Sequence, residues 1–378
     1  MTGKHPVTVN ITDWIKGMPL RKARDPKLQP PQDIHNLPLE EITLAEAFKA
    51  QGYQTFFAGK WHLGEEPEYW PEHQGFDINK GGYSWGRPSN GYYSPYNNPR
   101  LEDGPKGEYL TDRLGKESVR FLKSAGDDPF LLYLSFYTVH TPIQGCEKYD
   151  DHYRQEKQEL PNQGRVRVRE EHQAETRLNQ SNPKYAAMVR SMDENVGRVM
   201  DKLDELGLTE NTIIVFTSDN GGLTTKRNYG PTSVMPLRAG KDWCYEGGIR
   251  VPLIVQAPGI EGGTTCSYPV TSMDYYPTLL DLADFPAREN QHVDGESFAP
   301  YLRDPEQSYN RTLVWHYPHY HGSTWRPGSA IRHNQWKLIE FYETDAVELY
   351  NLKEDIGEQK DVSGKYPEKA RRLRERMH

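Results

Sequence analysis

The sequence has few cysteines, no excess of basic residues and no long apolar run. Its three cysteines, Cys146, Cys244 and Cys266, are too few and too scattered for a disulfide framework or a zinc cluster. The formal net charge of −8 argues against a nucleic-acid-binding protein, which usually carries a basic stripe. No apolar run approaches the roughly 18 residues needed to span a membrane. The absences favour a globular chain, long enough for one large domain and a smaller one.

Apolar runs of strand length alternate with helical periodicity along most of the chain. Strands are predicted near residues 53–58, 129–137, 212–218 and 251–256, and helices near residues 44–51, 110–123, 185–203 and 273–283. This alternation predicts an α/β fold with crossover connections. Residues 147–183 are polar and charged, which predicts an irregular surface excursion. After about residue 286, short strands and a charged terminal helix predict a small α+β domain, so the expected domains are 1–285 and 286–378.

The apolar, β-branched run 212–218 predicts a buried strand, and Asp219 and Asn220 follow it directly. In open α/β sheets, ligands bind beyond the carboxyl ends of the strands. A carboxylate and an amide oxygen at such an end are hard donors suited to Ca²⁺ or Mg²⁺. The alternative is an ordinary Asp-Asn-Gly turn between strand and loop.

Other predicted strand ends carry basic side chains. Lys60 and His62 follow the strand at 53–58, His140 follows the strand at 129–137, and Lys241 precedes the strand at 251–256. Lysines supply compact positive charge, and histidines donate to an oxygen or move a proton near neutral pH. Singly, each residue has an ordinary structural explanation, in a turn, in the core or on the surface. Together, at one edge of a sheet, they predict a pocket for a tetrahedral oxyanion.

Several segments together resemble the sulfatase family. Residues 52–62 (GYQTFFAGKWH) resemble a family signature, and the segments Asp219–Gly221, 237–241 (LRAGK) and 246–252 (EGGIRVP) resemble the family in the same order. Residues 336–339 and 348–352 resemble its C-terminal domain. The resemblance implies an alkaline-phosphatase-like mixed sheet flanked by helices, and a small α+β C-terminal domain containing an antiparallel sheet. It also implies an arylsulfatase-like sulfuric ester hydrolase that depends on Ca²⁺.

By the same resemblance, each site residue acquires an expected role. Asp219 and Asn220 would be metal ligands, and Lys60 and Lys241 would hold the sulfate. His62 would bond the hydroxyl of the nucleophile and act as a base when sulfate is expelled. His140 or Lys241 would protonate the leaving oxygen.

The family's nucleophile is a formylglycine made from the first residue of a Cys/Ser-x-Pro-x-Arg motif, which this sequence does not contain. A pair of upstream metal-binding aspartates expected from the family is also missing. The chain is therefore expected to begin downstream of both features, with an incomplete Ca²⁺ site. It is predicted to be catalytically inactive as written and only marginally stable, since buried strand edges would lose their partners.

A sulfated saccharide is the expected substrate or partner. Tyrosines and tryptophans gather in Gly/Pro-rich loops, and residues 316–321 (HYPHYH) supply His319 and His321 as candidate sugar contacts. A purely structural loop explains the same histidines equally well. Two rival functions stay open, a non-catalytic binder of sulfated glycans and a phosphoester hydrolase of the same fold. The resemblance implies a periplasmic or extracellular location, although the N-terminal residues lack an apolar export signal.

Overall fold

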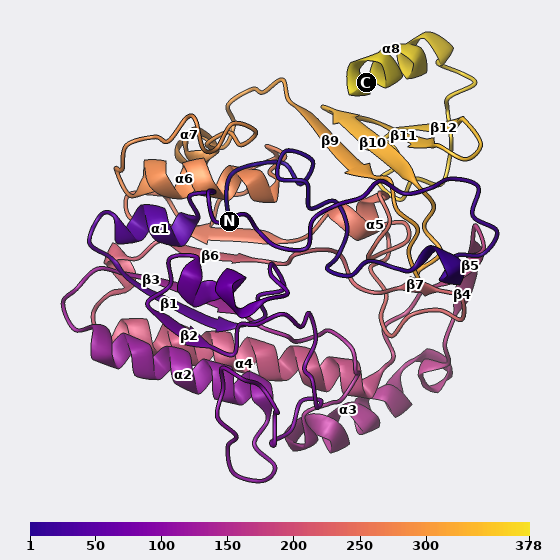
Figure 1. Ribbon diagram of the computed structural model, residues 1–378. Coiled ribbons are helices and arrows are strands. Elements are labelled where there is room, and N and C mark those ends of the chain that lie inside the picture. The colour runs from indigo at the N-terminus through magenta and orange to yellow at the C-terminus, as the bar shows by residue number, and fades with distance from the viewer.

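The computed structural model describes residues 1–378. A parallel sheet of three strands lies at its centre, in the order β2-β1-β3 (Figure 1). The strands are β1 (Gln54–Gly59), β2 (Ile78–Lys80) and β3 (Phe130–Ser135). All three run parallel, as expected for strands joined by crossover connections. The carboxyl ends of β1 and β3 therefore meet at one edge of the sheet.

A second pair of strands, β6 (Ile214–Thr217) and β8 (Leu253–Gln256), is antiparallel. The sequence predicts β6 correctly as a strand, but its predicted burial is wrong. Every residue of β6 is only half-buried, because the strand pairs with β8 on one edge alone. β3 is likewise paired on one edge, with β1. The apolar run predicted the strand, but it carried no information on the number of its neighbours.

A cleft of about 2600 Å³ is lined by β3 on one side and β6 on the other. Consecutive residues of both strands line this cleft. The unpaired edges of β3 and β6 therefore face the cleft, together with side chains of these strands. Its floor includes Met192, Val196 and Val199 of a long helix. β3 and β6 thus each have one unpaired edge, as the sequence led us to expect. The marginal stability of the chain remains a prediction.

Helices cover both faces of the central strands (Figure 1). α2 and α4 lie side by side on one face, and α1 and α6 lie on the other. The helices of these layers are α1 (Leu44–Lys49), α2 (Leu110–Ala125), α4 (Pro183–Glu205) and α6 (Tyr275–Leu282). Thr43 and Glu46 form a capping box at the start of α1, as the sequence predicts. In the core, Phe56 of β1 stacks on Phe121 of α2 with ring centroids 4.6 Å apart. No helix of the structure is both long enough and apolar enough to cross a membrane.

The prediction of an irregular excursion over residues 147–183 is wrong. This segment contains a helix and a β-hairpin. The hairpin pairs with a third strand, which follows α4 in the chain. The elements are α3 (Glu147–Glu159), β4 (Val168–Glu171), β5 (Ala174–Arg177) and β7 (Thr225–Lys226). The segment is too polar to show periodic burial, and none of the residues of α3 is buried. α3 is held by packing against α4, which the local sequence pattern does not report.

The C-terminal part forms an antiparallel sheet of four strands with α8 packed against it (Figure 1). The strands, in the order β12-β11-β10-β9, are β9 (Thr312–Tyr317), β10 (Gly328–His333), β11 (Trp336–Phe341) and β12 (Ala346–Asn351). The remaining helices are α5 (Glu246–Ile249), α7 (Ala299–Arg303) and α8 (Pro367–Met377). This sheet agrees with the expected small α+β unit. The exact boundary at residues 285 and 286 remains a prediction.

Candidate functional site

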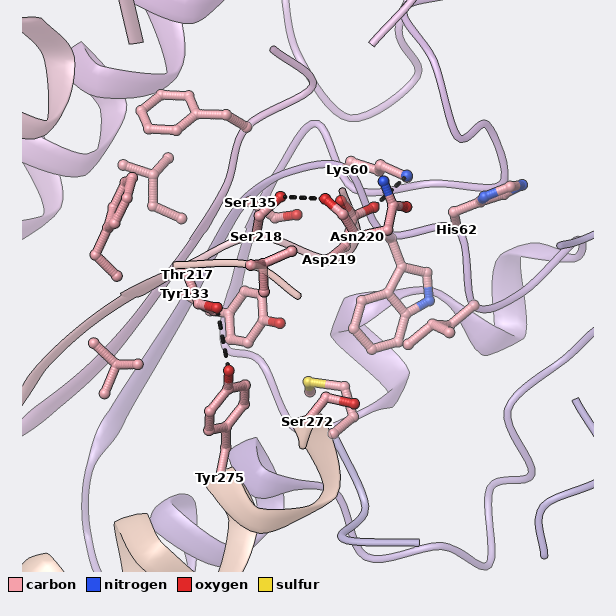
Figure 2. A pocket seen from close by; sticks show the side chains of 18 of the residues that line it. Lys60, His62, Tyr133, Ser135, Thr217, Ser218, Asp219, Asn220, Ser272 and Tyr275 are labelled. Carbon is pink, nitrogen blue, oxygen red and sulfur yellow. Dashed lines mark hydrogen bonds and ion pairs between the residues drawn. The ribbon is translucent and has the colours of Figure 1, made fainter. Parts of the chain in front are cut away.

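Two strand ends bring opposite charges together at the mouth of the cleft (Figure 2). Lys60 follows β1, where its main-chain N–H donates to the carbonyl of Ser135 at the end of β3 (2.8 Å). Its Nζ lies 3.4 Å from Oδ2 of Asp219, which follows β6. The Lys60 side chain is 19% exposed, and that of Asp219 is 64% exposed. Asp219 therefore presents a carboxylate to the cleft, and Lys60 lies behind it.

Lys241 lies near Asp219, on a loop whose main chain packs against the main chain of the turn that follows β6. Its N–H donates to the carbonyl of Gly222 (2.9 Å), and the N–H of Gly221 donates to the carbonyl of Gly248 (2.9 Å). A Cβ atom added at Gly221 would lie 1.8 Å from the carbonyl oxygen of Gly247. Only glycine permits so close an approach. The Asp219–Gly222 turn and the Lys241 loop are therefore held together by main-chain hydrogen bonds.

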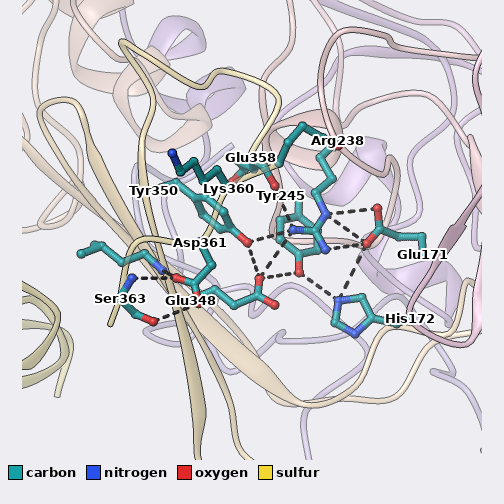
Figure 3. A network of polar contacts seen from close by, with 12 residues as sticks. Glu171, His172, Arg238, Tyr245, Glu348, Tyr350, Glu358, Lys360, Asp361 and Ser363 are labelled. Atoms are coloured by element: carbon teal, nitrogen blue, oxygen red, sulfur yellow. Dashed lines mark hydrogen bonds and ion pairs between the residues drawn. The ribbon is translucent and has the colours of Figure 1, made fainter. Parts of the chain in front are cut away.

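Arg238 anchors the start of the Lys241 loop (Figure 3). Its guanidinium donates to both carboxylate oxygens of Glu171, at 2.7 to 3.1 Å. It also donates to Oη of Tyr350 (2.8 Å) and to the main-chain carbonyl of Glu358 (2.9 Å), and it lies 3.9 Å from the ring centroid of Tyr245. Glu171 belongs to β4, so a single side chain joins the hairpin, the C-terminal sheet and the Lys241 loop. Sequence reasoning missed this role, although Arg238 lies inside the quoted segment 237–241.

The two histidines lie on the same cleft as the lysines. His140 follows β3, and its Nδ1 lies 3.1 Å from the carbonyl of Thr141. A proton on Nδ1 satisfies that carbonyl and leaves Nε2 as an acceptor. His62 lies two residues beyond Lys60 in a left-handed backbone conformation, with φ of 56°. All four basic residues predicted from the sequence are thus brought to one rim.

The charges of this rim act on one another. Burial, together with the positive charges of Lys60 and Lys241, lowers the pKa of His62 to about 4. Burial and the same charges lower the pKa of His140 to about 4. Burial also lowers the pKa of Lys60. For Asp219, partial removal from water by the surrounding protein opposes ionisation, but the two lysines outweigh it and lower the pKa of the carboxyl. The site therefore combines cationic lysines with two neutral imidazoles at pH 7, a suitable arrangement for an incoming anion.

The donors at Asp219 and Asn220 do not complete a calcium site. Ca²⁺ takes six to eight oxygen ligands. Asp219 and Asn220 offer one carboxylate and one amide oxygen, and no group of three or more His, Cys, Asp or Glu side chains able to hold a metal ion is present in the structure. The amide nitrogen of Asn220 donates to the carbonyl of Gly221 (2.9 Å), so its amide oxygen takes no part in that contact. The residues of this chain fit one side of a metal site but not a whole one.

The two histidines proposed as sugar contacts differ in position. His321 lines the cleft, with its side chain 19% exposed. His319 is buried, and its Nε2 bonds Oγ1 of Thr12 (2.8 Å). His319 therefore holds the N-terminal segment against the C-terminal sheet and does not line the cleft. Direct sugar contact by either histidine remains a prediction. Sequence reasoning missed Trp14 and Asp242, which lie beside His321 on the cleft.

The chain matches two family models. The Sulfatase model matches residues 20–285, and the model described as N-sulphoglucosamine sulphohydrolase, C-terminal, matches residues 239–378. A protein named Sulfatase from Formosa agariphila is 36% identical over 293 residues, covering 72% of this chain and 49% of that protein. The Ulvan-active sulfatase of the same organism is 31% identical over 380 residues, covering 97% of this chain and 66% of that protein. The chain spans about half to two thirds of the length of these relatives.

Solved structures have the same architecture. The structure described as Ps i-CgsB in complex with k-i-k-neocarrahexaose superposes with a TM-score of 0.76 at 27% identity, covering 100% of this chain and 79% of that chain. The structure described as the sulfatase yidJ from Bacteroides fragilis superposes with a TM-score of 0.74 at 19% identity, covering 100% of this chain and 82% of that chain. At that identity the second likeness concerns the fold alone.

Proposed function

The chain belongs to the sulfatase family, and from this premise we propose that its cleft binds the sulfate ester group of a sulfated saccharide. The convergence of Lys60, Lys241, His62 and His140 on one rim carries the proposal. A sulfate group presents oxygens in several directions and needs positive charge and N–H donors around it. The saccharide is supported by the relative named an ulvan-active sulfatase and by the carbohydrate complex of the structural neighbour.

We assign the following roles for sulfate ester cleavage. Lys60 and Lys241 hold the sulfate oxygens and neutralise their charge. His62, uncharged at pH 7, accepts a proton. His140 or Lys241 gives a proton to the leaving oxygen. For His140 this requires Nε2 to be protonated first, which the arrival of an anion favours because it offsets the charge of the lysines.

The nucleophile and most of the metal ligands are not supplied by these residues. A metal ion, when bound, would add fixed positive charge beside the ester, and Asp219 and Asn220 would be its ligands from this chain. The sequence contains no Cys/Ser-x-Pro-x-Arg motif. We therefore propose that the 378-residue polypeptide binds the anion without turning it over.

A non-catalytic binder of sulfated glycans is the second candidate. The same missing motif favours it, because a pocket with positive charge but no nucleophile retains affinity alone. Sulfate binding without turnover by this polypeptide agrees with both candidates, the hydrolase and the non-catalytic binder. Turnover restored when a polypeptide carrying the nucleophile motif is supplied would favour the hydrolase. A periplasmic or extracellular location is part of the hydrolase proposal, and cell fractionation tests it.

Sulfate binding to the purified chain is the decisive measurement. Isothermal titration calorimetry with sodium sulfate should detect binding. Lys60→Ala and Lys241→Ala should each weaken it about tenfold or more, because each removes a charge-assisted contact. Lys353→Ala, at an exposed lysine of the C-terminal part, is the matched control and should change nothing. Absence of binding, or equal effects of all three variants, would overturn the proposal. Robust release of sulfate from a small aryl sulfate by this polypeptide would refute its predicted inactivity.

A further inference from the structure

A second wall of the cleft lies next to the lysines and is built from three distant segments. Trp14 comes from the N-terminal segment, Asp242 directly follows Lys241, and His321 lies in the connection between β9 and β10. The Trp14 and His321 rings meet edge to face, with centroids 6.4 Å apart. Trp14 is 45% exposed although it lines a cleft. A large aromatic side chain left uncovered beside a polar cluster is suited to stacking on a ligand.

The carboxylate of Asp242 is held by a single contact, with His321, that does not have hydrogen-bond geometry. Its side chain is 10% exposed, and its Oδ2 is buried without a hydrogen-bond partner. Nδ1 of His321 lies 2.8 Å from this Oδ2. The same nitrogen also lies 3.1 Å from the main-chain N–H of Ser323, so it is shared between that group and the carboxylate. A carboxylate held by one such contact keeps acceptor capacity for a donor on a bound ligand.

A second carboxylate strengthens the negative charge of this wall. Asp13 is 6% exposed, and its Oδ1 accepts a hydrogen bond from Oη of Tyr317 (2.8 Å). Asp13 accepts well-formed hydrogen bonds from Tyr317 and from the main-chain N–H of Trp14, so it contributes charge rather than a free acceptor. Asp242 directly follows Lys241 of the anion pocket, and both residues line the same cleft. The wall and the pocket therefore lie close enough to act on one bound molecule.

The combination selects one kind of ligand. An aromatic face packs on the apolar face of a sugar ring, and a carboxylate accepts hydrogen bonds from sugar hydroxyls. The same carboxylates repel an anionic group placed next to the ester. We propose that Trp14, Asp242 and His321 form a sugar subsite that accepts a neutral, hydroxyl-bearing ring and rejects a ring with a second anionic group. This inference rests on the proposed function and specifies the substrate class of that site.

Calorimetry on the 378-residue chain tests the subsite with defined probes. The probes are inorganic sulfate, the 6-sulfates of galactose, glucose and N-acetylglucosamine, and the 2,6-disulfate of galactose. The best 6-sulfate should bind about fivefold to tenfold more tightly than inorganic sulfate. The disulfate should bind more weakly than the monosulfate of the same sugar. Failure of every probe, inorganic sulfate included, would refute the proposed function. Sulfate binding with no gain from any sugar would overturn the subsite alone.

Two variants separate contact from charge. Trp14→Ala should remove the gain from the sugar and leave the affinity for inorganic sulfate unchanged. Asp242→Asn should tighten binding of the disulfate about threefold to tenfold, a gain that a damaged fold cannot mimic. Asp193→Asn, at an exposed carboxylate of α4, is the control and should leave every ratio unchanged. The subsite is refuted if Trp14→Ala keeps the sugar-to-sulfate ratio, or if Asp242→Asn keeps the ratio of disulfate to monosulfate.

Discussion

His62 and His140 stay uncharged well below neutral pH because the fold buries them beside two lysines. Their pKa values lie at about 4 in the free site. A sulfate ion brings negative charge to the same rim, which raises both values toward the range of a free histidine. Anion binding and proton uptake are therefore linked.

Sulfate affinity should increase as the pH falls. Between pH 7 and pH 5, the complex takes up protons that the free protein does not, so affinity should rise about threefold to tenfold. Titrations in two buffers of different ionisation enthalpy measure the protons taken up. His62→Gln and His140→Gln should each reduce that number. An affinity independent of pH, with no proton uptake, would contradict the linkage.

Among the elements, the β4–β5 hairpin and the Lys241 loop depend on one side chain. Glu171 is 3% exposed, and Arg238 is its principal partner (Figure 3). Removing one member of a buried ion pair leaves an uncompensated charge. The guanidinium also has a planar fork that a lysine cannot reproduce.

Arg238→Met should lower the free energy of unfolding by about 3–5 kcal/mol. It should also weaken sulfate binding, because Lys241 lies three residues farther along the loop. Urea unfolding and calorimetry measure the two effects. Arg169→Met is a matched control, since Arg169 lies 3.4 Å from the same carboxylate but is 30% exposed. Equal destabilisation by both variants would contradict the special role of Arg238.

At the scale of the whole molecule, a buried triad joins the C-terminal sheet to the rest of the fold. Lys337 of β11 lies 3.0 Å from Glu246 of α5 and 2.9 Å from Glu358, and all three side chains are at most 1% exposed. Burial and the charge of Glu246 raise the pKa of Glu358 to about 7. One lysine therefore holds two carboxyl groups, one of which ionises near neutral pH.

Glu358 makes stability depend on pH in a direction opposite to the histidines. Its folded pKa of about 7 exceeds the unfolded value of 4.5, so its contribution is complete below pH 4.5 and is lost as the pH rises to 7. The histidines lose their contribution as the pH falls from 6.5 to 4. Glu358→Gln removes the first effect only. Its unfolding free energy, measured in urea from pH 4 to 7, should rise with pH more steeply than that of the wild type. Parallel profiles would contradict the assignment.

Lys337→Met should be among the most damaging single changes. It leaves Glu246 and Glu358 buried without their shared cation, at a cost of about 3–5 kcal/mol. Lys369→Met on α8, whose ammonium lies over Trp336 at 4.4 Å, is a control with a smaller expected loss. Thermal unfolding of both variants provides the comparison.

The sequence predicted the features that depend on local hydrophobic periodicity and on short motifs. β1, β3 and β6 and the helices between them follow from periodicity, and the positions of Lys60, His140 and Asp219 follow from the strand ends. The pairing of Glu171 with Arg238 joins residues far apart in the chain, within a segment too polar to show periodic burial. The exposure of Trp14 and the contact of Asp242 with His321 depend on how three segments meet, which no local pattern encodes.

The unpaired edges of β3 and β6 have a consequence for handling the protein. An open strand edge flanked by apolar side chains is a template on which other polypeptides pair. Tyr133 of β3 and Ile254 of β8, the strand paired with β6, are exposed apolar side chains, at 37% and 63%. Self-association of this polypeptide should therefore grow with concentration and with time spent warm. Its soluble lifetime would be set by how often two such edges meet, before any question of catalysis arises.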